Sequence, residues 1–186
     1  MISTAEFKKG VPIMFKGQPY IIVGIEFQNP GKGQAFYRVK LKNLKTGQVL
    51  DNTFKSGETA EEASLQYRKS QYLYNQGNDY FFMDMDSYEQ FSLDGNSLGD
   101  QTKFLKEGMD LHAMYLEGNP CAIKLPNKVE YKVVEAEAGV KGDTASGGDK
   151  VAKIETGAKI KVPLFVKEGD TVKVNTETGL YDTRVS

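Results

Sequence analysis

The sequence contains no tryptophan, one cysteine and one histidine among its 186 residues. A single cysteine, Cys121, cannot form an internal disulfide, and it cannot complete a zinc site together with one histidine. We therefore expect no bound metal and no cofactor. The cysteine content also fits a reducing compartment.

Long apolar runs are absent as well. No stretch approaches the length that spans a membrane, and the first nine residues lack the apolar core of a signal peptide. We expect a cytoplasmic protein with no membrane partner. Excess charge of either sign is also missing, because 24 Lys/Arg face 25 Asp/Glu. A protein that coats nucleic acids would be strongly basic, so this balance argues against that class.

The charge is distributed unevenly along the chain. Residues 1–64 hold nine Lys/Arg and six Asp/Glu, residues 65–127 hold five and nine, and residues 128–186 hold ten and ten. Two polar segments, 57–62 and 126–128, separate these three blocks. We therefore predict three small domains with the bounds 1–64, 65–127 and 128–186.

Many glycines and aromatic residues, 19 Gly, 10 Tyr and 10 Phe, indicate short strands and turns rather than helices. One short helix is predicted over 100–106, with Asp100 as its N-cap, after a turn at Ser97-Leu98. The predicted strands cover residues 11–16, 19–28, 35–44, 48–55, 66–74, 79–85, 88–93, 110–117, 120–125, 129–137, 151–155, 159–166, 171–175 and 180–185. Strands at such regular spacing are typical of β-sandwiches and β-barrels.

The second and third of these strands flank a short apex, Asn29-Pro30-Gly31-Lys32-Gly33-Gln34. Pro30 and Gly31 favour a type II turn, in which glycine takes positive φ at the third position. The flanking glycines leave Lys32 without bulky neighbours, so its ammonium group is expected to extend from the hairpin tip. A solvated lysine in an ordinary turn is the alternative interpretation.

The strand after this apex alternates between two faces. Tyr37, Val39 and Leu41 are predicted to point inward, and the intervening Arg38, Lys40 and Lys42 outward. Basic side chains next to aromatic ones are compatible with RNA contact. A merely polar outer face explains the same pattern, and charge alone does not decide between the two.

Catalytic motifs are scarce. His112 and Cys121 lie nine residues apart on neighbouring predicted strands, but no third group is evident that would orient a thiolate–imidazole pair. No phosphate-binding glycine loop and no paired carboxylates in an acid–base setting occur. The sequence therefore predicts a binding protein rather than an enzyme.

Several motifs together resemble the bacterial elongation factor P family, in order from near residue 6 to the end of the chain. The quoted motifs are Pro30-Gly31-Lys32-Gly33-Gln34-Ala35-Phe36 with Arg38-Val39-Lys40-Leu41, then Gly139-Val140-Lys141-Gly142-Asp143-Thr144, Glu155-Thr156-Gly157-Ala158, Val162-Pro163-Leu164-Phe165-Val166, Gly169-Asp170 and Val174-Asn175-Thr176-Glu177-Thr178-Gly179-Leu180-Tyr181-Asp182-Thr183-Arg184. The C-terminal set is long and specific, whereas Pro-Gly-Lys-Gly alone would be weak.

The resemblance implies an all-β protein of three small barrels in an L-shaped, tRNA-like arrangement. The first would be a KOW/SH3-like barrel and the other two would be OB-folds. It further implies a monomeric translation factor that binds both ribosomal subunits beside the peptidyl-tRNA and relieves stalling at consecutive prolines.

The resemblance also assigns site residues. Lys32 would reach the acceptor end of the peptidyl-tRNA and would be the target of a lysine-modifying enzyme, with Pro30, Gly31 and Gly33 shaping the loop. Possible contacts to the tRNA backbone are Arg38, Lys40 and Lys42. Possible contacts near the exit-site codon and ribosomal RNA are Gly142, Asp143, Thr144, Tyr181 and Arg184.

One position departs from the family pattern. Many relatives have a lysine just before the Pro-Gly pair, whereas this chain has Asn29. This leaves open which modifying enzyme, if any, recognises the loop. Three other functions also stay open: a paralogue with different ribosomal clients, a general single-stranded RNA-binding OB module, and an enzyme that uses Cys121 and His112.

Overall fold

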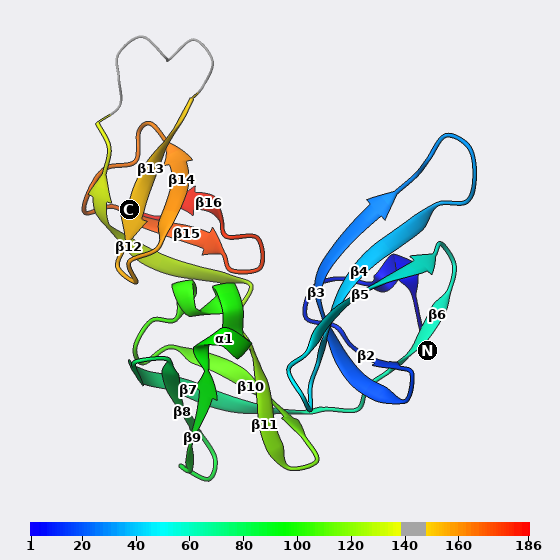
Figure 1. The fold of residues 1–186 in the computed structure, drawn as a ribbon. Coiled ribbons are helices and arrows are strands. Elements are labelled where there is room, and N and C mark those ends of the chain that lie inside the picture. The colour runs from blue at the N-terminus through cyan, green and yellow to red at the C-terminus, as the bar shows by residue number, and fades with distance from the viewer. Residues whose placement is uncertain (139–147) are drawn as a thin grey trace. The chain divides into compact units, whose positions relative to one another are not determined.

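The computed structural model describes residues 1–138 and 148–186 and contains mainly β-strands (Figure 1). In chain order the elements are β1 (Ile2–Ser3), η1 (Thr4–Glu6), β2 (Pro12–Phe15), β3 (Gln18–Gln28), β4 (Phe36–Asn43), β5 (Val49–Lys55), β6 (Thr59–Glu62), β7 (Gln66–Gln76), β8 (Asp79–Asp84), β9 (Gln90–Asp94), α1 (Gly95–Leu98), η2 (Gly99–Phe104), β10 (Asp110–Leu116), β11 (Asn119–Lys124), β12 (Lys128–Ala136), β13 (Asp149–Ile154), β14 (Lys159–Pro163), β15 (Thr171–Asn175) and β16 (Leu180–Arg184). The prediction of an all-β chain is confirmed.

The strands form three sheets, with the orders β1-β6-β2-β3-β4-β5, β11-β10-β7-β8-β9 and β14-β13-β12-β15-β16. Neighbouring strands such as β2 and β3, β3 and β4, and β7 and β8 pair antiparallel, as expected for strands joined by short turns, and so do β12 and β15. By compactness the chain divides into a unit of residues 1–68 and 113–124 and a unit of residues 69–112 and 125–186. The three predicted domain bounds remain a prediction.

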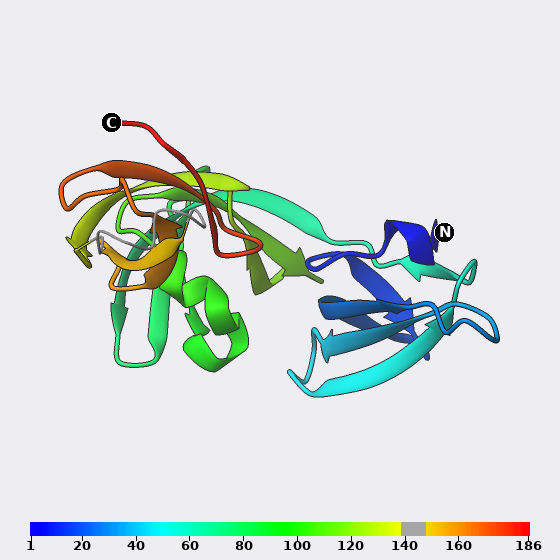
Figure 2. The same ribbon diagram turned by 90° about the horizontal axis from the view of Figure 1, so that it is seen from above.

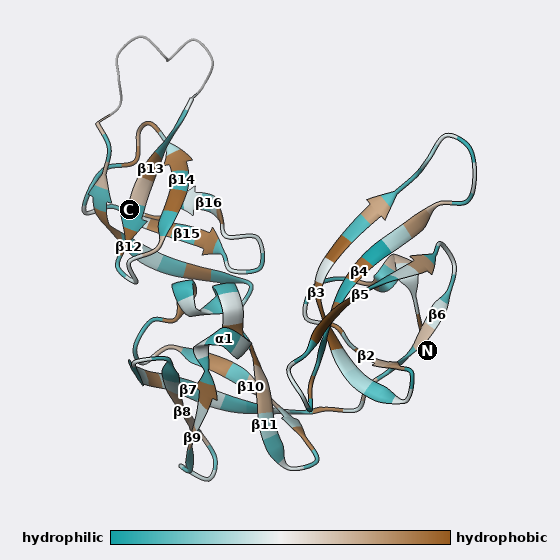
Figure 3. Cartoon of the chain, in the orientation of Figure 1, coloured by the Kyte–Doolittle hydropathy of each residue, from teal (hydrophilic) through white to brown (hydrophobic). Residues whose placement is uncertain are grey.

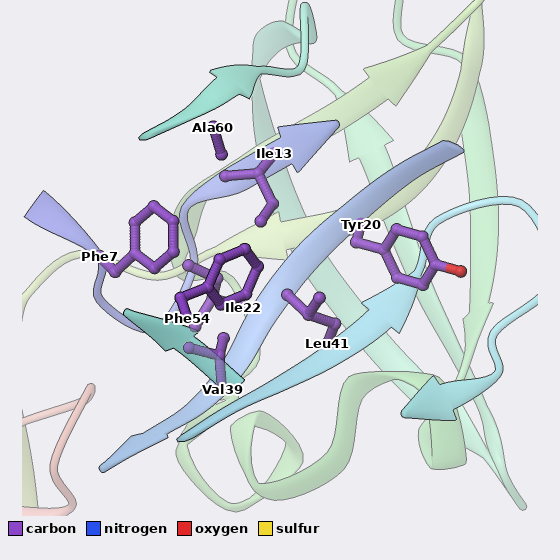
Figure 4. Packing of buried hydrophobic residues seen from close by; sticks show 8 residues of the cluster. All are labelled: Phe7, Ile13, Tyr20, Ile22, Val39, Leu41, Phe54 and Ala60. Carbon is purple, nitrogen blue, oxygen red and sulfur yellow. The ribbon is translucent and has the colours of Figure 1, made fainter. Parts of the chain in front are cut away.

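The first unit has its core between the curled strands of the first sheet. Its buried side chains, shown in Figure 4, are Phe7, Ile13, Tyr20, Ile22, Val39, Leu41, Phe54 and Ala60. Val39 and Leu41 are fully buried, whereas Arg38 and Lys40 between them are exposed. Figure 3 colours the same strand by hydropathy, and the burial alternation confirms the predicted two faces of β4.

The second unit contains a buried connection between the short helices and the third sheet. The hydroxyl of Tyr131 on β12 donates to the carbonyl oxygen of Phe104 at the end of η2, at 2.6 Å. Nearby, the Thr156 hydroxyl donates to the Lys103 carbonyl at 2.6 Å, and Lys106 forms an ion pair with Glu155 at 3.0 Å. Burial raises the pKa of Tyr131, so its hydroxyl keeps its proton and remains a donor.

Three expectations about local structure are wrong. Residues 59–62, predicted only as part of a polar boundary, form strand β6 between β1 and β2. The helix begins earlier than predicted, with Asp94 as the N-cap of α1 (its carboxylate accepts from the Asn96 amide at 2.7 Å) and Asp100 inside η2. Figure 2 shows this helical segment from above.

The third correction concerns the apex of the β3–β4 hairpin. Positive φ occurs at Gly33, at 103°, and not at Gly31. The predicted type II turn at Pro30-Gly31 is therefore absent. The longer loop lets the chain reverse at Gly33, which tolerates this conformation because it lacks Cβ.

Candidate functional site

The loop between β3 and β4 spans residues 29–35. Residues 29–34 are exposed to solvent, and Lys32 lies near the middle of the loop. Within the described parts of the chain, residues 29–33 take part in no hydrogen bond and Lys32 in no ion pair. The lysine is therefore displayed as the sequence predicted, on backbone whose polar groups are free to bind a partner.

The loop is fixed more firmly on its C-terminal side. The amide of Ser56 donates to the Ala35 carbonyl at 2.9 Å, and the Gln34 side-chain amide donates to the Ser56 carbonyl at 3.4 Å. On the other side, the last pair of the β3–β4 ladder joins Gln28 and Phe36. The segment that carries Lys32 thus leaves a well-paired hairpin and is held at its base.

A groove of ≈ 900 Å³ runs over the outer face of β3, β4 and β5. Its side chains come from all three strands and from the segment before β2. The lining residues are Lys9, Val23, Gly24, Ile25, Glu26, Arg38, Lys40, Asp51, Asn52 and Thr53. Gly24 contributes to the hollow, because it places no side chain on this face.

The three basic groups of the groove are unpaired among the described residues. Arg38 lies opposite Glu26 in the ladder, and Lys40 lies opposite Asp51, but neither pair forms an ion pair. The Arg38 guanidinium instead lies 6.0 Å from the centroid of the Phe36 ring. Polar groups at Asn52 and Thr53 complete a face suited to the oxygens of an anionic backbone.

Of the three predicted basic residues, Arg38 and Lys40 line the groove and Lys42 does not, whereas Lys9 is an addition. Lys42 is half-buried and does not line the groove, so it is not grouped with Arg38 and Lys40. The β3–β4 register shifts between Ile22 and Gly24, and such a bulge bends a strand. Lys9 joins the groove, although its position before β2 gave no sequence signal for it.

The predicted C-terminal residues lie on β16 in the second unit. The Arg184 guanidinium is 3.7 Å from the Asp170 carboxylate and 4.9 Å from the centroid of the Phe165 ring. Tyr181 is half-buried and pairs with Val174. Arg184 is thus oriented by neighbouring side chains. Gly142, Asp143 and Thr144 lie outside the described residues.

The candidate nucleophile has the wrong chemistry. The Cys121 thiol donates to the Met114 carbonyl at 3.4 Å, and burial raises its pKa, so the thiolate form is disfavoured. His112 is exposed on β10.

Among the described residues, no three His, Cys, Asp or Glu side chains gather into a possible metal site. No helix in the described part of the chain has the length and apolar character needed to cross a membrane.

Three family models match the chain. The elongation factor P (EF-P) KOW-like domain matches residues 3–60, the elongation factor P (EF-P) OB domain matches residues 65–123, and the model for elongation factor P, C-terminal, matches residues 129–184.

Whole proteins with the same name are similar over the full length. Elongation factor P of Moorella thermoacetica is 48% identical over 184 residues, which are 99% of this chain and 100% of that protein. Elongation factor P of Pelotomaculum thermopropionicum is 44% identical over 185 residues, with 100% of both chains covered. A solved structure of eukaryotic translation initiation factor 5A from Methanococcus jannaschii is 24% identical, with a TM-score of 0.41, and covers 67% of this chain and 91% of that one.

Proposed function

Because this chain belongs to the elongation factor P family and is a translation elongation factor, we propose that it binds the ribosome beside the peptidyl-tRNA and relieves stalling at consecutive prolines. It does so by positioning the acceptor end of the tRNA, without supplying a catalytic group. The partners are the peptidyl-tRNA and both ribosomal subunits, and the protein acts as a monomer in the cytoplasm.

One observation carries this proposal, namely the exposed loop 29–33 with Lys32 and without internal hydrogen bonds. Free amide and carbonyl groups flank a cation that has no partner of its own among the described residues. Phosphate oxygens at a tRNA end would accept from the Lys32 ammonium and the loop amides, and ribose hydroxyls would donate to the loop carbonyls. Because the loop is exposed, water binds these groups in the free protein, and a partner can replace that water.

The chemical step explains why positioning is enough. Proline is a poor reactant in peptide-bond formation, because its ring restricts the backbone. A misplacement of about 1 Å can lower a reaction rate about a hundredfold. A factor that holds the tRNA end in a reactive pose therefore restores the rate. Lys32 acts here as a donor and cation, and an adduct on its amine would lengthen its reach.

The groove gives the second contact. Arg38 and Lys40, joined by Lys9, are placed to bind the sugar–phosphate backbone of the tRNA behind its acceptor end. Lys42 is left out of this contact because it lies outside the groove. The acidic Glu26 and Asp51 among the basic groups limit the total attraction. A factor that leaves the ribosome after each cycle benefits from such limited affinity.

The second unit would contact the ribosome through Tyr181 and Arg184. The Arg184 guanidinium keeps donors beyond those facing Asp170, since arginine has five N–H groups. The proposed contacts of Gly142, Asp143 and Thr144 near the exit-site codon rest on the family pattern alone. A lysine-modifying enzyme completes the set of proposed partners, and Lys32 is its substrate.

The Lys32→Ala variant tests this function. We expect the rate of peptide-bond formation between prolines on the ribosome to fall toward the unassisted value, by up to about 100-fold. The melting temperature should not change, because Lys32 is exposed and without partners among the described residues. The intact mass of the natural protein, measured beforehand, reports whether Lys32 carries an adduct.

Lys16→Ala is the matched control. Lys16 is another exposed lysine in a hairpin turn of the same unit, followed by Gly17. The Lys16→Ala variant should stimulate proline–proline bond formation as well as the unchanged protein does. Undiminished synthesis of a polyproline reporter by Lys32→Ala would contradict the proposed function.

A further inference from the structure

Three aromatic residues lie in one row across the strands that lead to the loop. Phe27 on β3 pairs with Tyr37 on β4, and Tyr37 pairs with Phe54 on β5. The row lies on the face of the sheet opposite the groove, because Arg38 lies between Tyr37 and Val39 on the strand. It therefore has no part in the contacts proposed so far.

The inner end of the row belongs to the core of the first unit. Phe54 is 7% exposed, and its ring meets those of Phe7 at 5.3 Å and Phe15 at 5.8 Å, both edge-on. Figure 4 shows Phe54 beside Phe7 in this cluster. Tyr37 packs against the same cluster and is half-buried. The row thus begins on side chains that cannot move without disturbing the core.

The outer end of the row is Phe27, which is 53% exposed. Its ring centroid lies 4.9 Å from that of Tyr37, with an angle of 48° between the planes. Phe27 is not a member of the core cluster. Its burial therefore contributes little to the stability of the barrel, and the row ends two residues before the loop.

The strand that carries Phe27 needs such support. Strand β2 pairs with residues 18–21 of β3, and residues 10 and 11 add backbone hydrogen bonds to Ile22. Beyond Ile22, the ladder partner of β3 among the described residues is β4. The register also shifts at Val23, which weakens the ladder locally. Residues 23–28 of β3 lead directly into the loop that carries Lys32. They are the less restrained side of the hairpin, because Ser56 fixes the other side.

We propose that Phe27 is a positioning residue, which closes against Tyr37 and so fixes the direction in which the hairpin presents Lys32. This inference rests on the proposed function of Lys32. An aromatic pair of this geometry favours the closed arrangement by a factor of about 2 to 12. Without it, the end of β3 separates from β4 more often, and Lys32 is correctly placed in a smaller fraction of the bound complexes.

Hydrogen exchange tests the mechanical part without a ribosome. In Phe27→Ala, we expect the amides of residues 26–28 and 36–38 to exchange about 2- to 12-fold faster. Core amides of β2 and β5 should be unaffected. Phe27→Tyr, which keeps the ring, should restore the slow exchange, whereas Phe27→Val, which keeps only a good strand former, should not.

Ribosome kinetics test the functional part. For Phe27→Ala we expect the maximal rate of proline–proline bond formation to fall by up to about 12-fold, with the half-saturating factor concentration unchanged. Tyr74→Ala is the matched control. It removes the exposed partner of a cross-strand aromatic pair in the second unit, where Tyr74 stacks on Phe81 at 4.8 Å.

The outcomes separate the two proposals. A raised half-saturating concentration with an unchanged maximal rate would mean that Phe27 binds the ribosome directly, and it would overturn the positioning role. Unchanged exchange at the hairpin end would overturn it as well. A further outcome is that Lys32→Ala leaves proline–proline bond formation unchanged while Phe27→Ala still accelerates hydrogen exchange. In that case the proposed function fails, but the contact of Phe27 with Tyr37 still holds the end of the hairpin closed.

Discussion

The β3–β4 hairpin and the β15–β16 hairpin both carry residues proposed to contact RNA, but their turns are built differently. In the turn after β15, the Asn175 side-chain oxygen accepts from the amides of Glu177 and Thr178, at 2.9 and 3.1 Å. The Gly179 amide donates to the Asn175 carbonyl at 2.8 Å. In the loop after β3, residues 29–33 have no hydrogen bond among the described residues.

The same difference extends to charged side chains. Arg184 on β16 is oriented by Asp170 and by the Phe165 ring. Arg38 on β4 lies opposite Glu26 without forming an ion pair. The C-terminal hairpin thus satisfies its own polar groups, and the N-terminal hairpin leaves them available. A loop without internal hydrogen bonds depends on its base for order, which is the role proposed for Phe27.

The largest difference in stability between the two regions should appear when one tyrosine hydroxyl is removed from each. Tyr131→Phe removes the donor that binds the Phe104 carbonyl inside the second unit, at a position with 0% exposure. A buried acceptor left without its partner costs about 1–3 kcal/mol. We expect the unfolding transition of this unit to move to lower temperature in differential scanning calorimetry.

Tyr37→Phe is the corresponding change in the N-terminal hairpin. The Tyr37 hydroxyl forms no hydrogen bond within the described residues, and the ring that packs on Phe27 is retained. Its effect should stay within about 0.5 kcal/mol. Equal losses in the two variants would contradict the contrast between the regions.

A smaller difference is expected at the two asparagines of the turns. Asn175→Ala removes two hydrogen bonds to amides that define the C-terminal turn, and should cost about 1 kcal/mol. Asn29→Ala removes none and should be neutral to within about 0.5 kcal/mol. Urea unfolding curves of the pair provide the measurement. A destabilised Asn29→Ala would show that the N-terminal loop has local order of its own.

The contrast also explains which features the sequence could predict. The alternation of Tyr37, Val39 and Leu41 with basic residues specified β4, because one face of a strand must be buried and the period is two. Display of Lys32 followed from its glycine neighbours. Both are local properties of a short segment, and the structure agrees with them.

Features that depend on distant partners were missed. Strands β1 and β6 are short, and they form because β6 pairs with β1 on one side and with β2 on the other. The groove includes Lys9, which precedes β2, and excludes Lys42, which lies opposite Ile21 on the other side of the register shift from Gly24. A glycine with positive φ was expected at Gly31, but the length of the whole loop decides where the chain reverses.

The smallest predicted effect concerns the ion pair of Arg184. Asp170→Asn removes the negative charge 3.7 Å from the guanidinium, but it keeps a side-chain oxygen that can accept from the Lys167 amide. A partly exposed ion pair contributes about 0.2–1 kcal/mol, and this contribution is screened by salt. We expect that loss in urea unfolding at low ionic strength. It should vanish in 1 M sodium chloride, where the Debye length is about 3 Å.

Glu26→Gln provides the comparison in the N-terminal hairpin. Glu26 lies opposite Arg38 in the ladder but forms no ion pair with it, so its replacement should change stability little at either salt concentration. A salt-dependent loss in Glu26→Gln as large as that in Asp170→Asn would mean that Arg38 is also held by an acidic neighbour. Arg38 would then lose part of its attraction to a tRNA backbone, because that neighbour would compete with the phosphates for the same guanidinium.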